Sequence, residues 1–217
     1  MNASAHLTLQ AAEQAAGGQN HPASTLYVVA TPIGNLADIG LRALYLLAHA
    51  DTLACEDTRH TQQLIRSYGL DRPGNQLLAV HQHNEAEASQ EVLRRLAQGE
   101  RVAYVSDAGT PAISDPGARL VAAVRAAGLP VVPLPGASSV ITALSVAGIG
   151  GDGGEASGFV FAGFLPAKAT ERSVAVQALT TEPRAVVLLE APHRIEALAA
   201  ALTVLGERPL TLSLIHI

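Results

Sequence analysis

Short apolar runs alternate with longer amphipathic segments along most of the chain. Runs of this length, bounded by Gly, Pro, Asn or Asp, are typical of buried strands. We predict strands at LYVVAT (26–31), DTLACE (51–56), LLAVHQ (77–82), RVAYVS (101–106) and LPVVPL (129–134). Between them, apolar residues recur at helical spacing, and Asp38, Thr58 and Ser138 stand where helix caps are expected. The spacing predicts helices over 38–49, 58–68, 85–98, 116–127 and 138–146.

This alternation of strands and helices favours a parallel sheet with helical crossovers, an α/β fold. The strands are apolar throughout, as expected when helices cover both faces of the sheet. The Gly-rich stretch 148–158 interrupts the pattern and is typical of a linker between domains.

A second α/β unit is predicted after this linker. Its strands would be FVFAGF (159–164), AVVLLE (185–190) and LTLSLIHI (210–217), with helices over 170–179 and 193–205. We therefore predict two domains, 25–147 and 159–217, each with helices packed on a mainly parallel sheet. Residues 1–24 have weak helical periodicity and are expected to be a poorly ordered tail.

Composition agrees with a packed, soluble protein. Of 217 residues, 48% are hydrophobic and 15% charged, with few aromatics, so the core must be mostly aliphatic. The single cysteine, Cys55, excludes a disulfide framework and a multi-cysteine metal site. No run approaches the roughly 20 apolar residues of a membrane span, and no signal peptide is evident. We expect a cytoplasmic location. The net charge of −5 does not indicate a generic polyanion binder.

Candidate chemistry gathers in the loops that follow the strands. In an open parallel sheet, ligands bind outside the carboxyl ends of the strands. The loops there are TPIGN (31–35), EDTRHT (56–61), HQHNE (81–85), SDAGTPAISDPG (106–117) and PGASS (135–139). The fourth is longer than a connection needs, which favours a functional loop. We call residues 106–117 the signature loop.

The signature loop and PGASS suit a small polar ligand with a ribose or a carboxylate. Asp107 offers a carboxylate and Thr110 a hydroxyl, while Gly136 permits close approach and Ser138 lies at a helix N-terminus. The alternative is that the glycines only form turns and Ser138 only caps a helix. Three such loops at one sheet edge favour the ligand site.

Other motifs are absent or out of context. There is no Walker A sequence, and the Gly-x-Gly-x-x-Gly match at 148–153 follows a predicted helix rather than a strand. His81 and His83 have no third ligand at suggestive spacing, so we predict no metal site. Cys55 is expected to be a small buried residue.

Six segments resemble the ribosomal RNA small-subunit methyltransferase I family, within the tetrapyrrole methylase superfamily. They are VVATPIGNLADI, ACEDTRHTQQLI, VSDAGTPAISDPGARLV, PLPGASSVITAL, FAGFLPAK and EAPHRIEAL, in order from Leu26 to about Thr211. The resemblance implies S-adenosylmethionine in a cleft between two α/β domains, a homodimer, and no membrane association. It also implies methylation of the ribose 2′-hydroxyl of a decoding-centre cytidine in the 16S rRNA of the 30S subunit.

The same resemblance implies the cofactor residues. They are Pro32 and Ile33 in TPIGN, Asp107, Gly109, Thr110 and Ile113 in the signature loop, Ser138 and Ser139 in PGASS, and Leu165 from the second domain.

A general base would activate the acceptor hydroxyl. Asp57 is the first candidate, with Glu190 and His83 as alternatives; Glu56 and Asp57 would otherwise hold Arg59 or cap a helix. Candidates for RNA phosphate contacts are Arg59, Lys168, Arg172 and Arg194.

Two other functions stay open. One is a tetrapyrrole-type small-molecule C-methyltransferase, against which EDTRHT and GFLPAK argue; the other is an inactive S-adenosylmethionine-binding fragment. The last six residues, LSLIHI, match one reading frame of a common sequencing adapter. This leads to the hypothesis that they are a library artefact and the second domain is truncated, which genomic sequence running through LSLIHI would refute.

Overall fold

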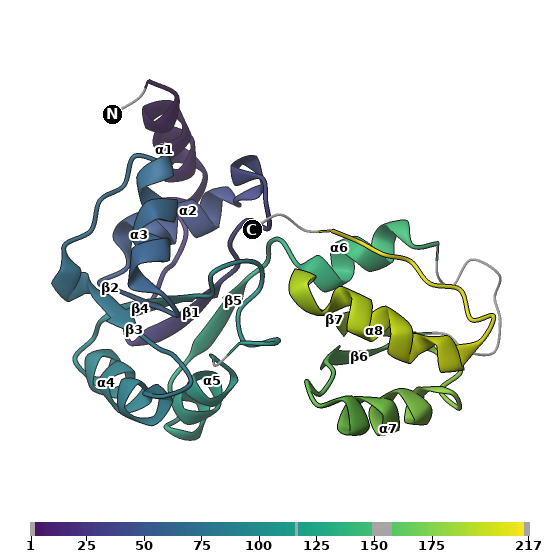
Figure 1. Cartoon of the computed structure of the whole chain (residues 1–217). Coiled ribbons are helices and arrows are strands. Elements are labelled where there is room, and N and C mark those ends of the chain that lie inside the picture. Colours follow the sequence, from purple (N-terminus) through teal and green to yellow (C-terminus); the bar gives the residue numbers. More distant parts are fainter. Residues whose placement is uncertain (1–2, 116, 149–157, 215–217) are drawn as a thin grey trace. The chain divides into compact units, whose positions relative to one another are not determined.

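The described residues divide into two compact units, one ending at Ser138 and the other spanning Ser139–Leu214. The computed structural model describes all residues except 1–2, 116, 149–157 and 215–217, and Figure 1 gives the element labels. Most of the expected linker 148–158 and the last three residues of LSLIHI therefore lie outside the described residues.

The first unit contains a five-stranded sheet in the order β3-β2-β4-β1-β5. All of its strand pairs are parallel. The strands are β1 (Thr25–Val29), β2 (Thr52–Cys55), β3 (Leu77–Ala79), β4 (Arg101–Val105) and β5 (Val131–Leu134). The expected strands are thus confirmed, each shorter by one to three residues, a usual difference at the ends of elements.

Helices cover both faces of this sheet (Figure 1). They are α2 (Leu41–His49) and α3 (Thr58–Ser67) on one face, and α4 (Glu85–Ala97) and α5 (Gly117–Ala126) on the other. Alternate side chains of β4 serve the two cores: Ala103 and Val105 face α2 and α3, while Val102 and Tyr104 face α4 and α5. Burial on both faces explains why the strands are apolar throughout.

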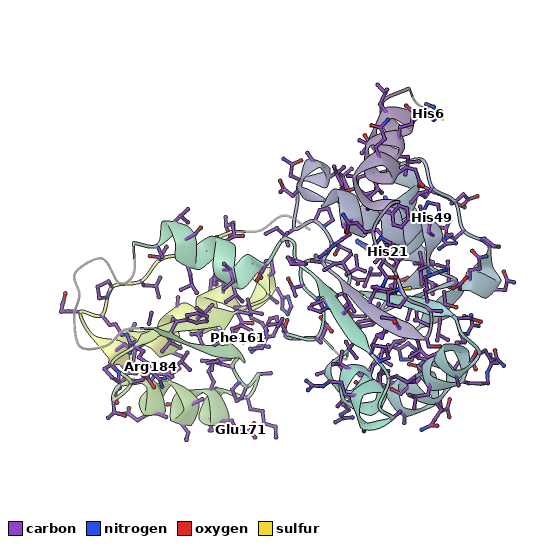
Figure 2. All side chains as sticks on the ribbon, turned by 180° about the vertical axis from the view of Figure 1, so that it is seen from behind. His6, His21, His49, Phe161, Glu171 and Arg184 are labelled. Atoms are coloured by element: carbon purple, nitrogen blue, oxygen red, sulfur yellow. The ribbon has the colours of Figure 1, made fainter. Side chains whose placement is uncertain are left out.

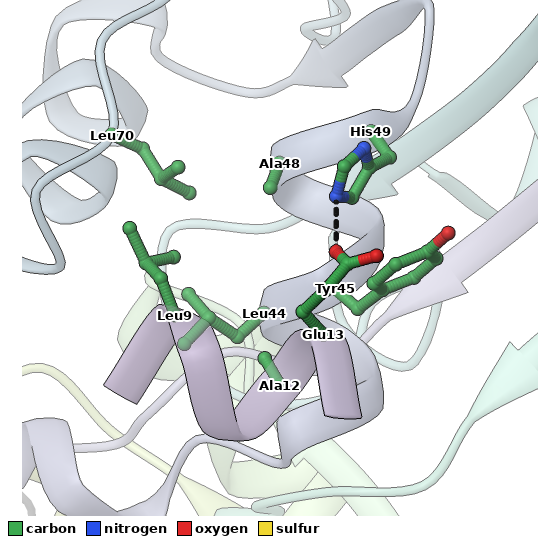
Figure 3. A pocket seen from close by; sticks show the side chains of 8 residues that line it. All are labelled: Leu9, Ala12, Glu13, Leu44, Tyr45, Ala48, His49 and Leu70. Atoms are coloured by element: carbon green, nitrogen blue, oxygen red, sulfur yellow. Dashed lines mark hydrogen bonds and ion pairs between the residues drawn. The ribbon is translucent and has the colours of Figure 1, made fainter. Parts of the chain in front are cut away.

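The expectation of a poorly ordered N-terminal tail is wrong. Residues Ala3–Ala16 form helix α1, which packs on α2. Ala12 is buried against Leu44 and Tyr68, and Glu13 Oε2 lies 2.9 Å from His49 Nε2 (Figure 3). Six of the 14 residues of α1 are Ala, which has the highest helix propensity and lets two helices approach closely.

The segment between α1 and β1 follows the same surface. His21 stacks on Tyr45 with ring centroids 4.9 Å apart, and Tyr45 stacks on His49 at 4.4 Å. Figure 2 shows His21 and His49 in the same region of the first unit. The N-terminal residues are therefore part of this unit.

Two helix starts differ from the expected ones. Asp38 does not cap α2, because residues Leu36–Asp38 form a 3-10 turn and Gly40 precedes the helix. Helix α3 is capped by Asp57 rather than Thr58. The expected start of α5, residue 116, lies outside the described residues.

The second unit contains a two-stranded parallel sheet of β6 (Phe159–Phe164) and β7 (Ala185–Leu189). Its helices are α6 (Ser139–Val146), α7 (Ala169–Leu179) and α8 (Ile195–Leu202), and short 3-10 turns flank α8. Leu165, Val176 and Leu198 form its core.

Two expectations about this unit need correction. Helix α6 was assigned to the first domain, but neither core cluster on the five-stranded sheet includes an α6 residue. The strand expected over 210–217 is not formed by its described part, Leu210–Leu214, where Leu210, Leu212 and Leu214 are all more than 60% exposed. An apolar run becomes a strand only when a neighbour pairs with it.

Candidate active site at the edge of the five-stranded sheet

The loops after β1 and β4 are joined at the carboxyl edge of the sheet. Thr31 N donates to Gly109 O at 2.9 Å, and Gly109 N donates to Thr31 O at 3.1 Å. Strands β1 and β4 are neighbours, yet the chain leaves them for helices on opposite faces. This is the topological switch point at which open α/β sheets bind ligands.

The PGASS loop after β5 joins the same cluster. Thr110 Oγ1 donates to Ala137 O at 2.9 Å. A Cβ atom on Gly136 would lie 2.7 Å from the Ala30 Cβ, so only glycine fits there. Gly109 has φ +81°, and a Cβ on it would lie 3.3 Å from Ile33 Cγ2. The three loops therefore meet through backbone at positions that favour glycine.

Asp115 fixes the conformation of the signature loop. Its carboxylate accepts hydrogen bonds from Ala112 N at 2.8 and 2.9 Å, from Gly117 N at 3.0 Å and from Tyr104 Oη at 3.2 Å. Ala112 has φ +65°, a strained value for a non-glycine residue. Asp115 is not among the residues predicted from the sequence. The signal for it is its place in SDPG, where an Asp side chain commonly bonds nearby backbone N–H groups.

Tyr104 supports the same loop from inside the sheet. Its ring lies so close to Gly117 that an added Cβ would be 2.1 Å from a ring carbon. Burial raises the pKa of the Tyr104 hydroxyl, and the Asp115 carboxylate raises it further. Tyr104 therefore stays protonated and donates to Asp115.

Asp107 supplies an acceptor with no donor. Among the described residues, its Oδ1 is buried and has no hydrogen-bond partner. A buried carboxylate oxygen is costly unless it is hydrogen-bonded. A ligand hydroxyl or amine at this loop would satisfy it.

The remaining predicted cofactor residues of the first unit differ in exposure. Pro32 is buried, Ile33 and Ser138 are half-buried, and Ile113 is 55% exposed. Ser139, also half-buried, begins α6 and belongs to the second unit. An exposed isoleucine beside a polar loop offers an apolar surface to a ligand ring.

Asp57 is held as a helix cap. Its Oδ1 accepts from Arg59 N at 2.7 Å and from His60 N at 3.4 Å. These two backbone hydrogen bonds lower the pKa of the carboxyl. The Arg59 side chain is 93% exposed, with Nε 3.7 Å from Asp57 Oδ1.

The predicted residues of the second unit lie around the loops that follow β6 and β7. Leu165 is only 7% exposed and its side chain packs in the core. Arg194 Nη2 donates to Leu165 O at 2.8 Å, and Arg194 Nε lies 3.1 Å from Glu190 Oε1. Arg194 thus ties the two loops together.

Lys168 and Arg172, the other cationic candidates of this unit, make different contacts. Lys168 is 79% exposed and pairs with Glu171 at 3.1 Å. Arg172 Nη1 donates to Ala167 O at 3.2 Å. Glu171 marks this end of α7 in Figure 2.

Cys55, His81 and His83 also lie at or after the ends of strands β2 and β3. Cys55 is buried as expected, and burial raises the pKa of its thiol to about 11. The rings of His81 and His83 have centroids 6.1 Å apart. Within the described residues, no group of three or more His, Cys, Asp or Glu side chains is arranged to hold a metal ion. In the same part of the chain, no helix is both long and apolar enough for a membrane span.

The chain belongs to the tetrapyrrole (corrin/porphyrin) methylase family, whose model matches residues 25–213. Among curated proteins, it is similar to those named ribosomal RNA small subunit methyltransferase I. The one from Xylella fastidiosa is 49% identical over 84% of this chain and 64% of its own length. The one from Pseudomonas aeruginosa is 50% identical over 85% and 63%, and the one from Escherichia coli O157:H7 is 48% identical over 84% and 61%. The chain thus spans a little over three fifths of these relatives.

Solved structures support the fold. Uroporphyrin III C-methyl transferase from Thermus thermophilus has a TM-score of 0.58 at 22% identity, covering 85% of this chain and 78% of its own. A cobalt precorrin-4 methyltransferase has a TM-score of 0.60 at 19% identity, covering 84% and 75%. The expected α/β fold of the tetrapyrrole methylase type is confirmed.

Proposed function

We propose that this protein is an S-adenosylmethionine-dependent methyltransferase of small-subunit ribosomal RNA, acting on the ribose 2′-hydroxyl of a decoding-centre cytidine in 16S rRNA. The observation that carries the proposal is the identity of about one half to relatives named for that class of enzyme. The identity extends over more than four fifths of this chain.

The joined loops fit the cofactor. S-adenosylmethionine carries a ribose, an amino acid group and an adenine ring, and when bound it supplies an electrophilic methyl group on a sulfonium. Asp107 would accept from a hydroxyl or amine of the cofactor, since its Oδ1 has no donor in the described residues. A uroporphyrin III C-methyl transferase of this fold has been solved in complex with S-adenyl homocysteine.

The remaining loop residues would orient the cofactor. Gly109 and Gly136 allow the close packing of the loops that would surround it, and Thr110 ties these loops together. Pro32, Ile33 and Ile113 would offer apolar contacts, and Ser138 and Ser139 hydroxyl groups. Leu165 would take part through its backbone, because its side chain lies in the core. Such positioning contributes much of the rate in a transfer between two bound groups.

The cationic residues would contact RNA phosphates in different ways. The Arg59 side chain is exposed beside Asp57, and the Lys168 side chain is exposed beside Glu171. Arg172 and Arg194 each donate to a backbone carbonyl, so fewer of their donors face solvent. We assign the first contacts with RNA to Arg59 and Lys168. The substrate would be the assembled 30S subunit in the cytoplasm, and the enzyme a homodimer.

Incubation with labelled S-adenosylmethionine tests the proposal. The acceptors are 30S subunits that lack this methyl group and, separately, a porphyrinoid. Label in the 16S ribose is the expected result. Label only in the porphyrinoid would instead support a small-molecule C-methyltransferase, and binding without transfer would support an inactive fragment.

A further inference from the structure

Glu56 lies beside the signature loop, although it belongs to a different strand connection. Strand β2 ends at Cys55, which pairs in parallel with Val105 of β4. Glu56 follows Cys55, and Ser106 and Asp107 follow Val105. Because adjacent parallel strands end at one edge, Glu56 and Asp107 leave the sheet side by side.

Two carboxylates act electrostatically on Glu56. They belong to Asp107 and Asp115, and both carry a like charge. Partial burial and then these two carboxylates raise the pKa of Glu56. Tyr104 is part of the same group. Its hydroxyl donates to Asp115, and the carboxylates of Glu56 and Glu85 also raise its pKa.

A buried acceptor on α4 also belongs to this group. The Glu85 side chain is only 7% exposed, and among the described residues its Oε1 has no hydrogen-bond partner. Its Oε2 lies 3.4 Å from Nη1 of the exposed Arg119 of α5. Asp107 Oδ1 is likewise without a partner. Two buried oxygens lacking donors indicate a ligand that brings hydroxyl or amino hydrogens.

Glu56 and Asp57 are neighbours in sequence with opposite environments. Two backbone N–H groups fix the Asp57 carboxylate and lower its pKa, which makes it a weaker base. Partial burial and two like charges instead raise the pKa of Glu56. A carboxylate with a raised pKa is closer to the working pH and accepts a proton more readily.

We propose that Glu56 is the general base that takes the proton from the acceptor hydroxyl. This inference rests on the proposed function. As the hydroxyl O–H bond breaks, its proton moves to the Glu56 carboxylate and the oxygen bonds to the methyl carbon. The carbon–sulfur bond breaks in the same step, its electron pair stays on sulfur, and the sulfonium becomes a neutral thioether. Glu56 then releases the proton to water.

The test compares three variants in single-turnover methyl transfer to 30S subunits across pH. Glu56→Gln removes the base, Asp57→Asn removes the neighbouring carboxylate, and Glu87→Gln changes an exposed carboxylate of α4 as the matched control. We expect Glu56→Gln to lose about 100-fold or more in rate. Its affinity for S-adenosylmethionine, measured by calorimetry, should stay within about 3-fold of wild type, because Glu56 acts on the acceptor.

A second readout does not depend on activity. The Glu56 carboxyl carbon, followed by NMR during a pH titration, should titrate above the ordinary glutamate range, and Asp107→Asn should lower its midpoint. A Glu56 titration midpoint in the ordinary glutamate range that Asp107→Asn does not change would overturn the inference.

The kinetic outcomes separate this inference from the proposed function. If wild type methylates 30S subunits while Glu56→Gln keeps its rate, or if only Asp57→Asn loses it, Glu56 is not the base and the proposed function stands. If wild type methylates no RNA, the proposed function fails and this inference fails with it.

Discussion

Three donors of the signature loop and its supporting strand converge on the carboxylate of Asp115. They are the backbone N–H groups of Ala112 and Gly117 and the hydroxyl of Tyr104. Asp115→Ala leaves all three unpaired. We expect a loss of about 2–3 kcal/mol in the free energy of unfolding, since each such bond contributes about 1 kcal/mol.

Because the loop also carries Asp107 and Gly109, Asp115→Ala should weaken S-adenosylmethionine binding about tenfold or more. Urea unfolding and calorimetry measure the two effects. Tyr104→Phe removes one donor and should cost about 1 kcal/mol. Ser114→Ala, at an exposed neighbour, is the control. Equal stability and affinity for Asp115→Ala and Ser114→Ala would contradict this role.

The Asp57 cap gives a pH-dependent contribution to stability. Its pKa is lower in the folded state, so the stabilisation is present above the unfolded pKa of about 3.9 and is lost as pH falls through the folded value. Asp57→Ala should therefore lower the urea midpoint at pH 7 and lose that effect in strong acid. A difference from wild type that does not shrink as pH falls through the folded-state pKa would contradict the capping role.

Two glycines in the loop motifs have a structural reason in the backbone. Gly109 has φ +81°, and an added Cβ on Gly136 would lie 2.7 Å from the Ala30 Cβ. The roles of these loops in cofactor binding stay predictions. Asp115 was missed because its partner, Ala112, becomes available only once the loop adopts a positive φ. Asp57 was predicted as a base, with capping as the alternative; the structure supports capping, and its catalytic role stays a prediction.

Close packing between elements depends on two glycines. Gly117 of α5 faces the Tyr104 ring, and Gly136 after β5 faces Ala30 after β1. Alanine at either position should cost about 1–3 kcal/mol through overpacking. Gly74→Ala is the matched control, since nothing lies within 4 Å of its added Cβ. Thermal unfolding of the three variants checks this, and an unchanged Gly117→Ala protein would contradict the close contact.

Helix α1 is expected to stabilise the first unit. Ala12 is 1% exposed against Leu44 and Tyr68, so Ala12→Glu would force a charge into an apolar contact. We expect a loss of about 2–4 kcal/mol. Leu7→Gln on the same helix, 65% exposed, should have little effect. Matching urea midpoints for the two variants would show that α1 does not pack as described.

Helices and strands were predicted correctly where the local pattern of residues alone determines them. The five strands of the first sheet combine apolar runs with turn residues, and all five form. Helix α1 was missed because small alanines give little hydrophobic contrast between its faces. A strand was predicted over 210–217, but Leu210–Leu214 do not form one, because an apolar run does not specify the neighbouring strand that it needs.

The fold was easier to predict than the site, because the residue pattern determines the strands but not the ligands. The first unit contains the three joined loops, and each loop follows a strand whose position the alternating pattern determines. Leu165, Lys168, Arg172 and Arg194 belong to the second unit, and their roles depend on ligands that the sequence pattern does not specify. The net charge of −5 likewise says nothing about which face meets RNA.

The central claim is methyl transfer to a ribose of small-subunit ribosomal RNA, and mapping the transferred methyl group tests it most directly. Unmethylated 30S subunits are incubated with the protein and isotope-labelled S-adenosylmethionine, and the 16S rRNA is digested to nucleosides and analysed by mass spectrometry. We expect label in 2′-O-methylcytidine from the decoding centre. Label confined to a base carbon or nitrogen, or 16S rRNA without label while a porphyrinoid acceptor is methylated, would contradict it.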